Sequence, residues 1–233
     1  MYANITQRRI VAELLDILPA DDPRAVASRR DLIWINALML QSQLMASLLR
    51  RHTTRPPTTI LELGCGDGAF MLAVARRMGW RDVRLVMIDR KDIVTAETRT
   101  AFAELGWRME MKVADIFDWL ATTPTGPFDL VCANLVLHHF DDKALVTLFT
   151  RLGDISSLFV ATEPRRSAVA LGGCAMLRAI GVNDVTRHDA AASVRAGFAA
   201  KELSNLWPKG RDMRFEERQM GLFTHAFVAE RHQ

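Results

Sequence analysis

The chain has few of the features that indicate a disulfide-bonded, metal-binding or membrane protein. Its three cysteines, Cys65, Cys132 and Cys174, are far apart in 233 residues and form no C-x-x-C pair. Neither a disulfide framework nor a zinc site is indicated, and we predict no metal. No apolar run approaches about 18 residues, and no signal-type segment opens the chain. We therefore expect a cytoplasmic protein that does not enter a membrane.

Charge of one sign is also scarce. The 30 basic and 27 acidic residues leave a net charge of only +3. Arginine pairs such as Arg29-Arg30 and Arg76-Arg77 are scattered and read as solvated helix faces. A single tyrosine offers no stacking platform of the kind that single-stranded RNA binders use. Nucleic acid is thus disfavoured as a partner, whereas a homo-oligomer is compatible with the sequence.

The most informative feature that is present is a glycine-rich turn. A short apolar run over residues 60–63 ends in Gly64, Gly66 and Gly68, and a helix-like stretch follows over residues 69–78. Glycine has no Cβ, so a strand–glycine–helix turn lets the backbone come close to a nucleoside. The spacing is neither the G-x-G-x-x-G of dinucleotide binders nor a P-loop.

The rest of the chain alternates between strand and helix patterns. Continuous apolar strands separated by helices predict a parallel sheet covered on both faces. The last two strand patterns, separated by only three residues, predict an antiparallel hairpin. Helical spacing of apolar residues predicts helices before the glycine turn. The predicted elements are strands at 60–63, 83–88, 109–114, 128–137, 158–162, 213–219 and 223–230, and helices at 4–18, 24–51, 69–78, 95–105 and 141–152.

Together with this strand order, the pattern of Glu62, Gly64, Gly66 and Gly68 resembles motif I of the class I S-adenosylmethionine (SAM) dependent methyltransferases. The resemblance implies an α/β fold, with a Rossmann-like seven-stranded, mostly parallel sheet and a C-terminal antiparallel hairpin. It also implies SAM as cofactor, with S-adenosylhomocysteine (SAH) as product. We expect an N-terminal helical cap over residues 1–57 and a SAM-binding domain over residues 58–233, with a helical insert at 164–188.

The resemblance also assigns residues to the cofactor, because ligands of open α/β sheets bind at the carboxyl ends of the strands. It places the methionine end of SAM at the glycine turn beside Glu62. Asp89 ends the second strand, where a carboxylate accepts hydrogen bonds from both ribose hydroxyls. Asp115 and Ile116 match the position that binds adenine, and Asn134 matches the position opposite the sulfonium.

Two segments bear on the methyl acceptor. Leu137-His138-His139-Phe140 follows the fourth strand and resembles small-molecule methyltransferases. It lacks the Asn/Asp-Pro-Pro-aromatic sequence of enzymes that methylate amino groups of nucleic acids. After the fifth strand, we expect Asp189 to cap a short helix and to leave His188 on the loop just before it.

A phenol has a pKa near 10, so a histidine with a pKa near 6.5 would assist its deprotonation. The candidate bases are His188, His139 and His138, in that order. We predict transfer of a methyl group to a hydroxyl of a small phenolic, polyketide-like or quinone-precursor acceptor. The alternatives are a C-methyltransferase on a similar ring, an RNA methyltransferase, and a non-catalytic SAM-fold binding protein.

Overall fold

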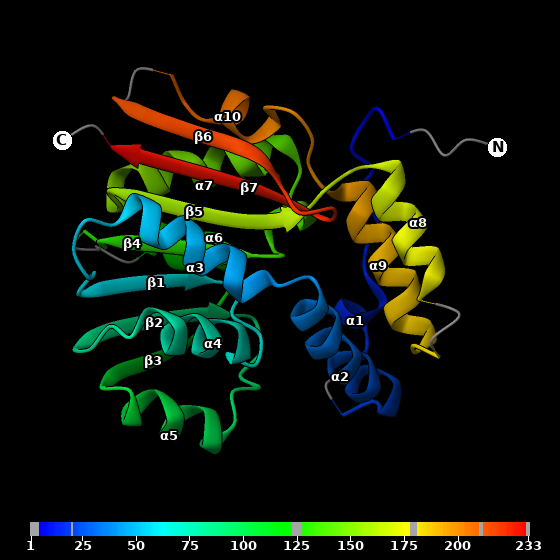
Figure 1. The fold of residues 1–233 in the computed structure, drawn as a ribbon, viewed down its shortest axis with the longest axis horizontal. Coiled ribbons are helices and arrows are strands. Elements are labelled where there is room, and N and C mark those ends of the chain that lie inside the picture. Colours follow the sequence, from blue (N-terminus) through cyan, green and yellow to red (C-terminus); the bar gives the residue numbers. More distant parts are fainter. Residues whose placement is uncertain (1–4, 20, 123–126, 178–180, 210–211, 232–233) are drawn as a thin grey trace.

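A seven-stranded sheet lies at the centre of the molecule in the computed structural model, which describes residues 5–19, 21–122, 127–177, 181–209 and 212–231 (Figure 1). The strand order is β3-β2-β1-β4-β5-β7-β6. The first five strands are parallel, and β7 pairs antiparallel with both β5 and β6. The predicted fold is thereby confirmed. The strands are β1 (Thr59–Leu63), β2 (Val83–Asp89), β3 (Trp107–Val113), β4 (Leu130–Asn134), β5 (Leu158–Pro164), β6 (Met213–Met220) and β7 (Thr224–Arg231).

Helices cover both faces of this sheet, as the apolar strands require. On one face, α3, α4 and α5 enclose one core, and on the other α6, α7 and α10 enclose a second. The helices are α1 (Leu14–Ile17), α2 (Pro23–Leu38), α3 (Gln41–His52), α4 (Ala69–Met78), α5 (Ala96–Glu104), α6 (Ile116–Thr122), α7 (Asp142–Ile155), α8 (Ala168–Met176), α9 (Asp184–Ala196) and α10 (Glu202–Leu206), with a 3₁₀ turn η1 (Leu137–His139).

Strand β1 shows how the sequence produces these two cores. Successive side chains of a strand point to opposite faces. Ile60 therefore packs in the core under α3 and α4, while Leu61 and Leu63 pack in the core under α6 and α7. The one charged residue of the strand, Glu62, is also buried. Glu62 precedes the last residue of β1, and a charged side chain buried in a covered strand calls for an explanation.

The predicted N-terminal helices differ from the observed ones. The helix expected over residues 4–18 is wrong except for the short α1, because the backbone of this segment bonds to other elements, as where Arg9 N donates to Arg195 O. The long helix expected over residues 24–51 is interrupted at Leu40, whose φ of 57° is left-handed, and so forms α2 and α3. Helix α6 was not predicted.

Helix α3 belongs to the sheet layer. Met45, Leu48 and Leu49 are buried in the core with residues of α4 and the strands. The cap predicted for residues 1–57 therefore divides between two packing units. Helices α1 and α2 pack instead against α9, which also contacts α8 from the insert. Helix α8 lies within the predicted 164–188 insert, and α9 begins there and continues to Ala196.

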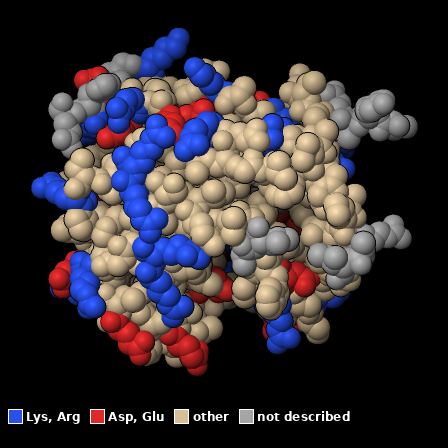
Figure 2. All heavy atoms as spheres, in the orientation of Figure 1, with Lys and Arg blue, Asp and Glu red and all other residues tan. Residues whose placement is uncertain are grey.

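These four helices, α1, α2, α8 and α9, gather beyond the carboxyl end of β5, where Figure 1 shows them as a group beside the sheet. We call this group, together with the N-terminal segment over residues 5–18, the cap. Within the described ranges, no helix is long and apolar enough to span a bilayer. Figure 2 shows basic side chains along one line of the visible face, with acidic groups near its ends, and mostly uncharged surface at the cap.

Candidate active site

The glycine turn after β1 depends on left-handed backbone. Gly64, Gly66 and Gly68 have φ values of 65°, 54° and 76°, which only glycine adopts without strain. The turn is tied to the neighbouring strand, because the amides of Gly64 and Cys65 both donate to the carbonyl of Ile88, at 2.9 and 3.2 Å. The predicted strand–turn–helix arrangement is therefore present, with α4 beginning right after Gly68.

Asp89 holds this turn from the end of β2. Its Oδ2 accepts a hydrogen bond from the amide of Gly66 at 2.9 Å, and its Oδ1 accepts one from the amide of Lys91 at 3.1 Å. A carboxylate has about four lone-pair positions, so both oxygens keep capacity for a ligand. The residue predicted to bind ribose thus lies in contact with the glycine turn.

The glycine turn is tightly packed at Gly64 and open at Gly66. A Cβ on Gly64 would come within 2.6 Å of Cγ2 of Val136, so this glycine is needed for packing against the chain after β4. A Cβ on Gly66 would meet nothing within 4 Å. The backbone at Gly66 therefore borders free volume, as expected where a ligand approaches a glycine-rich turn.

Glu62 is the most unusual group of the site. It is 2% exposed, and its Oε2 has no hydrogen-bond partner among the described residues. Burial raises the pKa of Glu62 well above its usual range, and the nearby carboxylates of Asp89 and Asp67 raise it further. A buried polar atom without a partner is costly, and such atoms in proteins call for a specific explanation. A ligand that brings a cationic donor would provide one.

The other predicted cofactor residues lie at the same edge of the sheet, because β1 to β4 are parallel. Asp115 follows β3, and its Oδ1 accepts from the amide of Phe117 at 2.8 Å, at the start of α6. The neighbouring Ile116 is buried. Asn134 ends β4, where its Oδ1 accepts from the hydroxyl of Thr162 at 2.8 Å.

Comparisons with known proteins agree with this geometry. Residues 60–155 match a family model described as a methyltransferase domain. Over 96 residues the chain is 38% identical to an uncharacterised methyltransferase of Mycobacterium bovis, covering 41% of this chain and 44% of the relative. A release factor glutamine methyltransferase of Rhodopirellula baltica is 31% identical over 84 residues, covering 36% of this chain and 28% of the relative. The chain therefore spans less than half the length of these curated relatives.

The fold is similar to that of solved methyltransferase structures. The plantazolicin methyltransferase BpumL in complex with SAH has a TM-score of 0.64 at 13% identity, over 91% of this chain and 92% of that one. The pyocyanin biosynthetic protein PhzM has a TM-score of 0.61 at 21% identity, over 95% of this chain and 62% of that one. The chain therefore shares the fold of these methyltransferases, and its residues 60–155 match the methyltransferase-domain model.

Beside the predicted SAM site, η1 brings two histidines together. The ring centroids of His138 and His139 lie 4.3 Å apart. His138 is 2% exposed, with Nδ1 at 2.8 Å from Oε2 of Glu163 and Nε2 at 3.3 Å from Oε1 of Glu13. Burial alone would lower the pKa of His138, but the hydrogen bonds to Glu13 and Glu163 raise it to about 9.

His139 has a different environment. Its Nδ1 lies 3.5 Å from Oδ2 of Asp16, and its side chain is 26% exposed. Burial lowers the pKa of His139, and the neighbouring His138 lowers it further. The two histidines predicted as candidate bases therefore differ, since both ring nitrogens of His138 face carboxylates and it has no nitrogen left for an acceptor.

His188 lies within α9 and not, as predicted, on a loop just before a helix. Helix α9 begins at Asp184 and is capped by Asn183, whose side chain accepts from the amide of Val185. Asp189 is thus inside α9 and caps no helix start of its own; its carboxylate instead accepts from the amides of Leu14 and Leu15. Asn183 offered the same capping chemistry six residues earlier. His188 nevertheless contacts Asp189, with Nδ1 at 2.9 Å from Oδ1.

Several residues that build this region were not predicted from the sequence. Glu163 ends β5 and is fully buried, with its Oε1 accepting from the amides of Val136 and Leu137. The rule that polar residues at the carboxyl ends of strands face the ligand, which identified Asp89, would also have identified Glu163.

Glu13 and Arg8 come from the N-terminal segment, where no local sequence pattern marks them. Arg8 donates to the carbonyls of Ala196 and Phe140, and so ties that segment to both α9 and η1.

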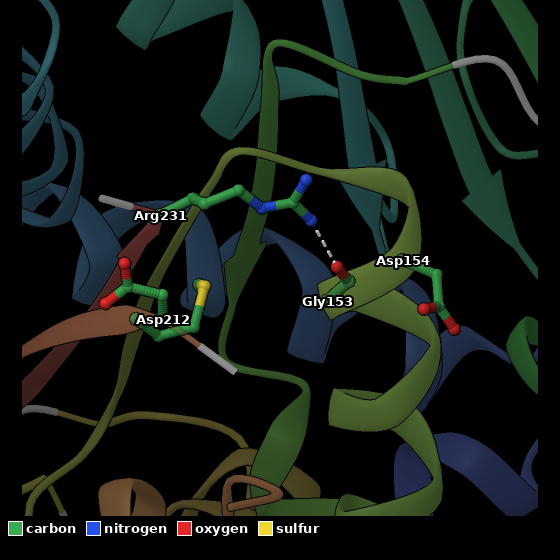
Figure 3. Close-up of a pocket in the computed structure, with 5 residues that line it drawn as sticks. Gly153, Asp154, Asp212 and Arg231 are labelled. Carbon is green, nitrogen blue, oxygen red and sulfur yellow. Dashed lines mark hydrogen bonds between the residues drawn. The ribbon is translucent and has the colours of Figure 1, made fainter. Parts of the chain in front are cut away.

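A surface depression of about 380 Å³ is lined by Gly153, Asp154, Asp212, Met213 and Arg231 (Figure 3). Arg231 ends β7, which runs antiparallel to β5. The depression therefore lies at the opposite edge of the sheet from the glycine turn and is not part of the candidate active site. Burial raises the pKa of the Cys65 and Cys132 thiols, which disfavours the nucleophilic thiolate form at both residues.

Proposed function

We propose that the protein binds SAM at the Gly64–Gly68 turn and transfers its methyl group to a hydroxyl of a small molecule. Two observations carry the first half of this proposal: the buried Oε2 of Glu62 has no partner within the described part of the chain, and the backbone of Gly66, four residues later, borders free volume. An ammonium group at this position would satisfy the carboxylate, and the amino acid end of SAM carries one. The residues therefore fit the cofactor.

Each residue of the edge has a distinct task in this proposal. Asp89, fixed by the amides of Gly66 and Lys91, accepts hydrogen bonds from the ribose hydroxyls. Asp115 and Ile116 border the adenine, and Asn134 borders the sulfonium. Bound SAM supplies a methyl group already activated for transfer. The chain itself has only to align an acceptor with that methyl group and exclude water.

The cap supports a small acceptor. Its N-terminal segment reaches the site by specific polar contacts, since Glu13 bonds His138 and the carboxylate of Asp189 holds the backbone of α1. These contacts cover the side of the sheet edge where the acceptor would enter. A small acceptor is also in keeping with the similar folds of BpumL, a plantazolicin methyltransferase, and PhzM, a pyocyanin biosynthetic protein.

For the general base, we propose His188. It is exposed, and the carboxylate of Asp189 orients its Nδ1 while no contact within the described chain engages Nε2. An imidazole oriented by a buried carboxylate through one nitrogen can accept a proton at the other. His138 lacks this freedom, because Glu163 and Glu13 face both of its nitrogens.

The test is a screen of phenols, polyketide-like hydroxy compounds and quinone precursors with SAM labelled at the methyl group, using Asp89→Ala as the inactive control. Label on a hydroxyl oxygen of a small acceptor supports the proposal. Label on ring carbon assigns C-methylation instead, and label on RNA assigns an RNA methyltransferase. SAM binding without transfer to any of these contradicts the activity but leaves the cofactor site standing.

A further inference from the structure

We propose that Glu13, His138 and His139 form a binding site for a divalent transition-metal ion, with zinc as the ion that best matches the ligands. One ligand atom from each of the three lies within 4.8 Å of those of the other two. Two imidazole nitrogens and a carboxylate oxygen are a ligand set that zinc uses in sites that keep a fourth position open. This inference does not rest on methyl transfer.

The distances suit a small tetrahedral ion. Ligand atoms about 2.0–2.1 Å from such an ion lie about 3.3–3.4 Å from each other. Oε1 of Glu13 and Nε2 of His138 are 3.3 Å apart. His139 is partly exposed at the edge of the group, so rotation of its ring brings its nitrogen to the same centre without moving the core.

Neighbouring carboxylates orient the ligands in the way that metal sites require. Glu163 is fully buried and held by backbone amides of η1, and it faces Nδ1 of His138. This contact fixes Nδ1 as a hydrogen-bond donor, so an ion that displaces the proton of Nε2 meets a lone pair directed towards Glu13. In metal sites, a carboxylate commonly accepts a hydrogen bond from the ring nitrogen of a histidine that does not bind the metal. Ser193 in α9 donates its hydroxyl to Glu13 and orients the third ligand.

A plain ion pair explains less of this arrangement. Glu13 and His138 alone would complete such a pair, and the second imidazole, with its ring centroid 4.3 Å from the first, would have no role in it. A shared ion uses both rings. It would also link the N-terminal segment directly to η1, at the sheet edge where the cap meets the cofactor site.

Sequence reasoning predicted no metal because the ligands are 125 residues apart in the chain, with Glu13 in a segment read as an ordinary helix. Glu13 meets the two histidines only because the N-terminal segment packs against η1. Within the described residues this is the one group of three or more metal-ligating side chains that converge.

The experiment titrates the tag-free, metal-stripped protein with zinc chloride in a calorimeter, and with cobalt chloride while the visible absorption is recorded. The proposal predicts one zinc ion per chain and a visible cobalt band typical of nitrogen and oxygen ligands. Glu13→Gln and His139→Gln should each weaken zinc binding about tenfold or more, since even outer partners of metal ligands contribute about 10- to 100-fold. Zinc should also raise the unfolding temperature of the parent protein.

His52→Gln is the matched control. His52 also lies between two carboxylates, at 3.1 and 3.2 Å, but these face opposite ring nitrogens and share no position for an ion. Zinc affinity should be unchanged in this variant. Absence of zinc binding to the parent, or equal affinity in Glu13→Gln, His139→Gln and His52→Gln, overturns the proposal. Circular dichroism of each variant establishes that a loss of binding is not a loss of fold.

Discussion

Glu62 shows how a single residue can indicate a ligand. Its place at the end of a buried strand would suit an apolar side chain, and a carboxylate there with an unpartnered oxygen costs about 1–3 kcal/mol or more. The glycine-turn pattern identified Glu62 from the sequence, but neither its missing partner nor its perturbed pKa could be predicted, because both depend on which strands and turns surround it.

We predict that SAH binding releases a proton from the protein. Burial and the charges of Asp89 and Asp67 keep Glu62 protonated to higher pH than in the unfolded chain. An ammonium group favours the ionised form and lowers this pKa again. Affinity should therefore rise as the pH increases through the raised pKa. Calorimetry in two buffers of different ionisation enthalpy measures the release.

Glu62→Gln is the control for this prediction, because it keeps the size of the side chain and removes the titration. The thiols of Cys65 and Cys132 also lie close to Glu62, and the raised pKa of each keeps them protonated. Binding in the Gln variant should be weaker and should release no proton. An equal proton count in parent and variant would show that another group titrates.

His188 carries the second prediction at this scale. His188→Ala should reduce the rate of transfer to a poorly acidic phenol by about 10²–10⁴, the usual effect of a general base. The loss should shrink for acceptors of lower pKa, which ionise without help, and SAH affinity should stay as in the parent. Rates on an acceptor series report this trend directly. A rate within about threefold of the parent on a poorly acidic phenol would exclude His188 as the base.

At the scale of elements, local signals were sufficient wherever the chain's own neighbours decide its conformation. Helix α5 was predicted over residues 95–105, and the hydroxyl of Thr95 caps it by accepting from the amide of Thr98. The N-terminal segment could not be predicted in this way. Its apolar spacing looks helical, but its polar groups are bound by α9 and η1, as shown by Arg8 and Glu13. Contacts between residues so far apart leave no local pattern.

Two truncations should separate the roles of the N-terminal elements. Removing residues 1–18 deletes the segment that covers the sheet edge, so SAH binding should persist while methyl transfer falls strongly. Removing residues 1–50 also deletes most of α3, including the buried Met45 and Leu49. Each such core side chain contributes about 2–5 kcal/mol, so this longer truncation should unfold.

Thermal unfolding, SAH calorimetry and transfer rates on both truncated proteins measure these outcomes. Full transfer activity without residues 1–18 would show that the segment does not shape the acceptor site. Cooperative unfolding of the longer truncation near the parent's temperature would show that α3 is not part of the core.

At the scale of the whole molecule, the sheet could be predicted well. Continuous apolar strands require cover on both faces, and parallel strands place their carboxyl ends at one edge, so Asp89, Asp115 and Asn134 had to come together. What could not be predicted is how the cap closes on that edge. The acceptor is therefore the part of the function that the sequence leaves open.

The central claim is that SAM binds at this edge through the glycine turn and Asp89, and calorimetric titration with SAH tests it most directly. Asp89→Asn keeps an acceptor for the amide of Gly66 but removes the charge, and should weaken binding about tenfold or more, since a hydrogen bond to a charged group contributes about 1.5–3 kcal/mol. Asp82→Asn, at the opposite end of β2 where a φ of 58° suits Asn as well as Asp, should bind like the parent. Equal SAH affinity in a folded Asp89→Asn variant would contradict the account.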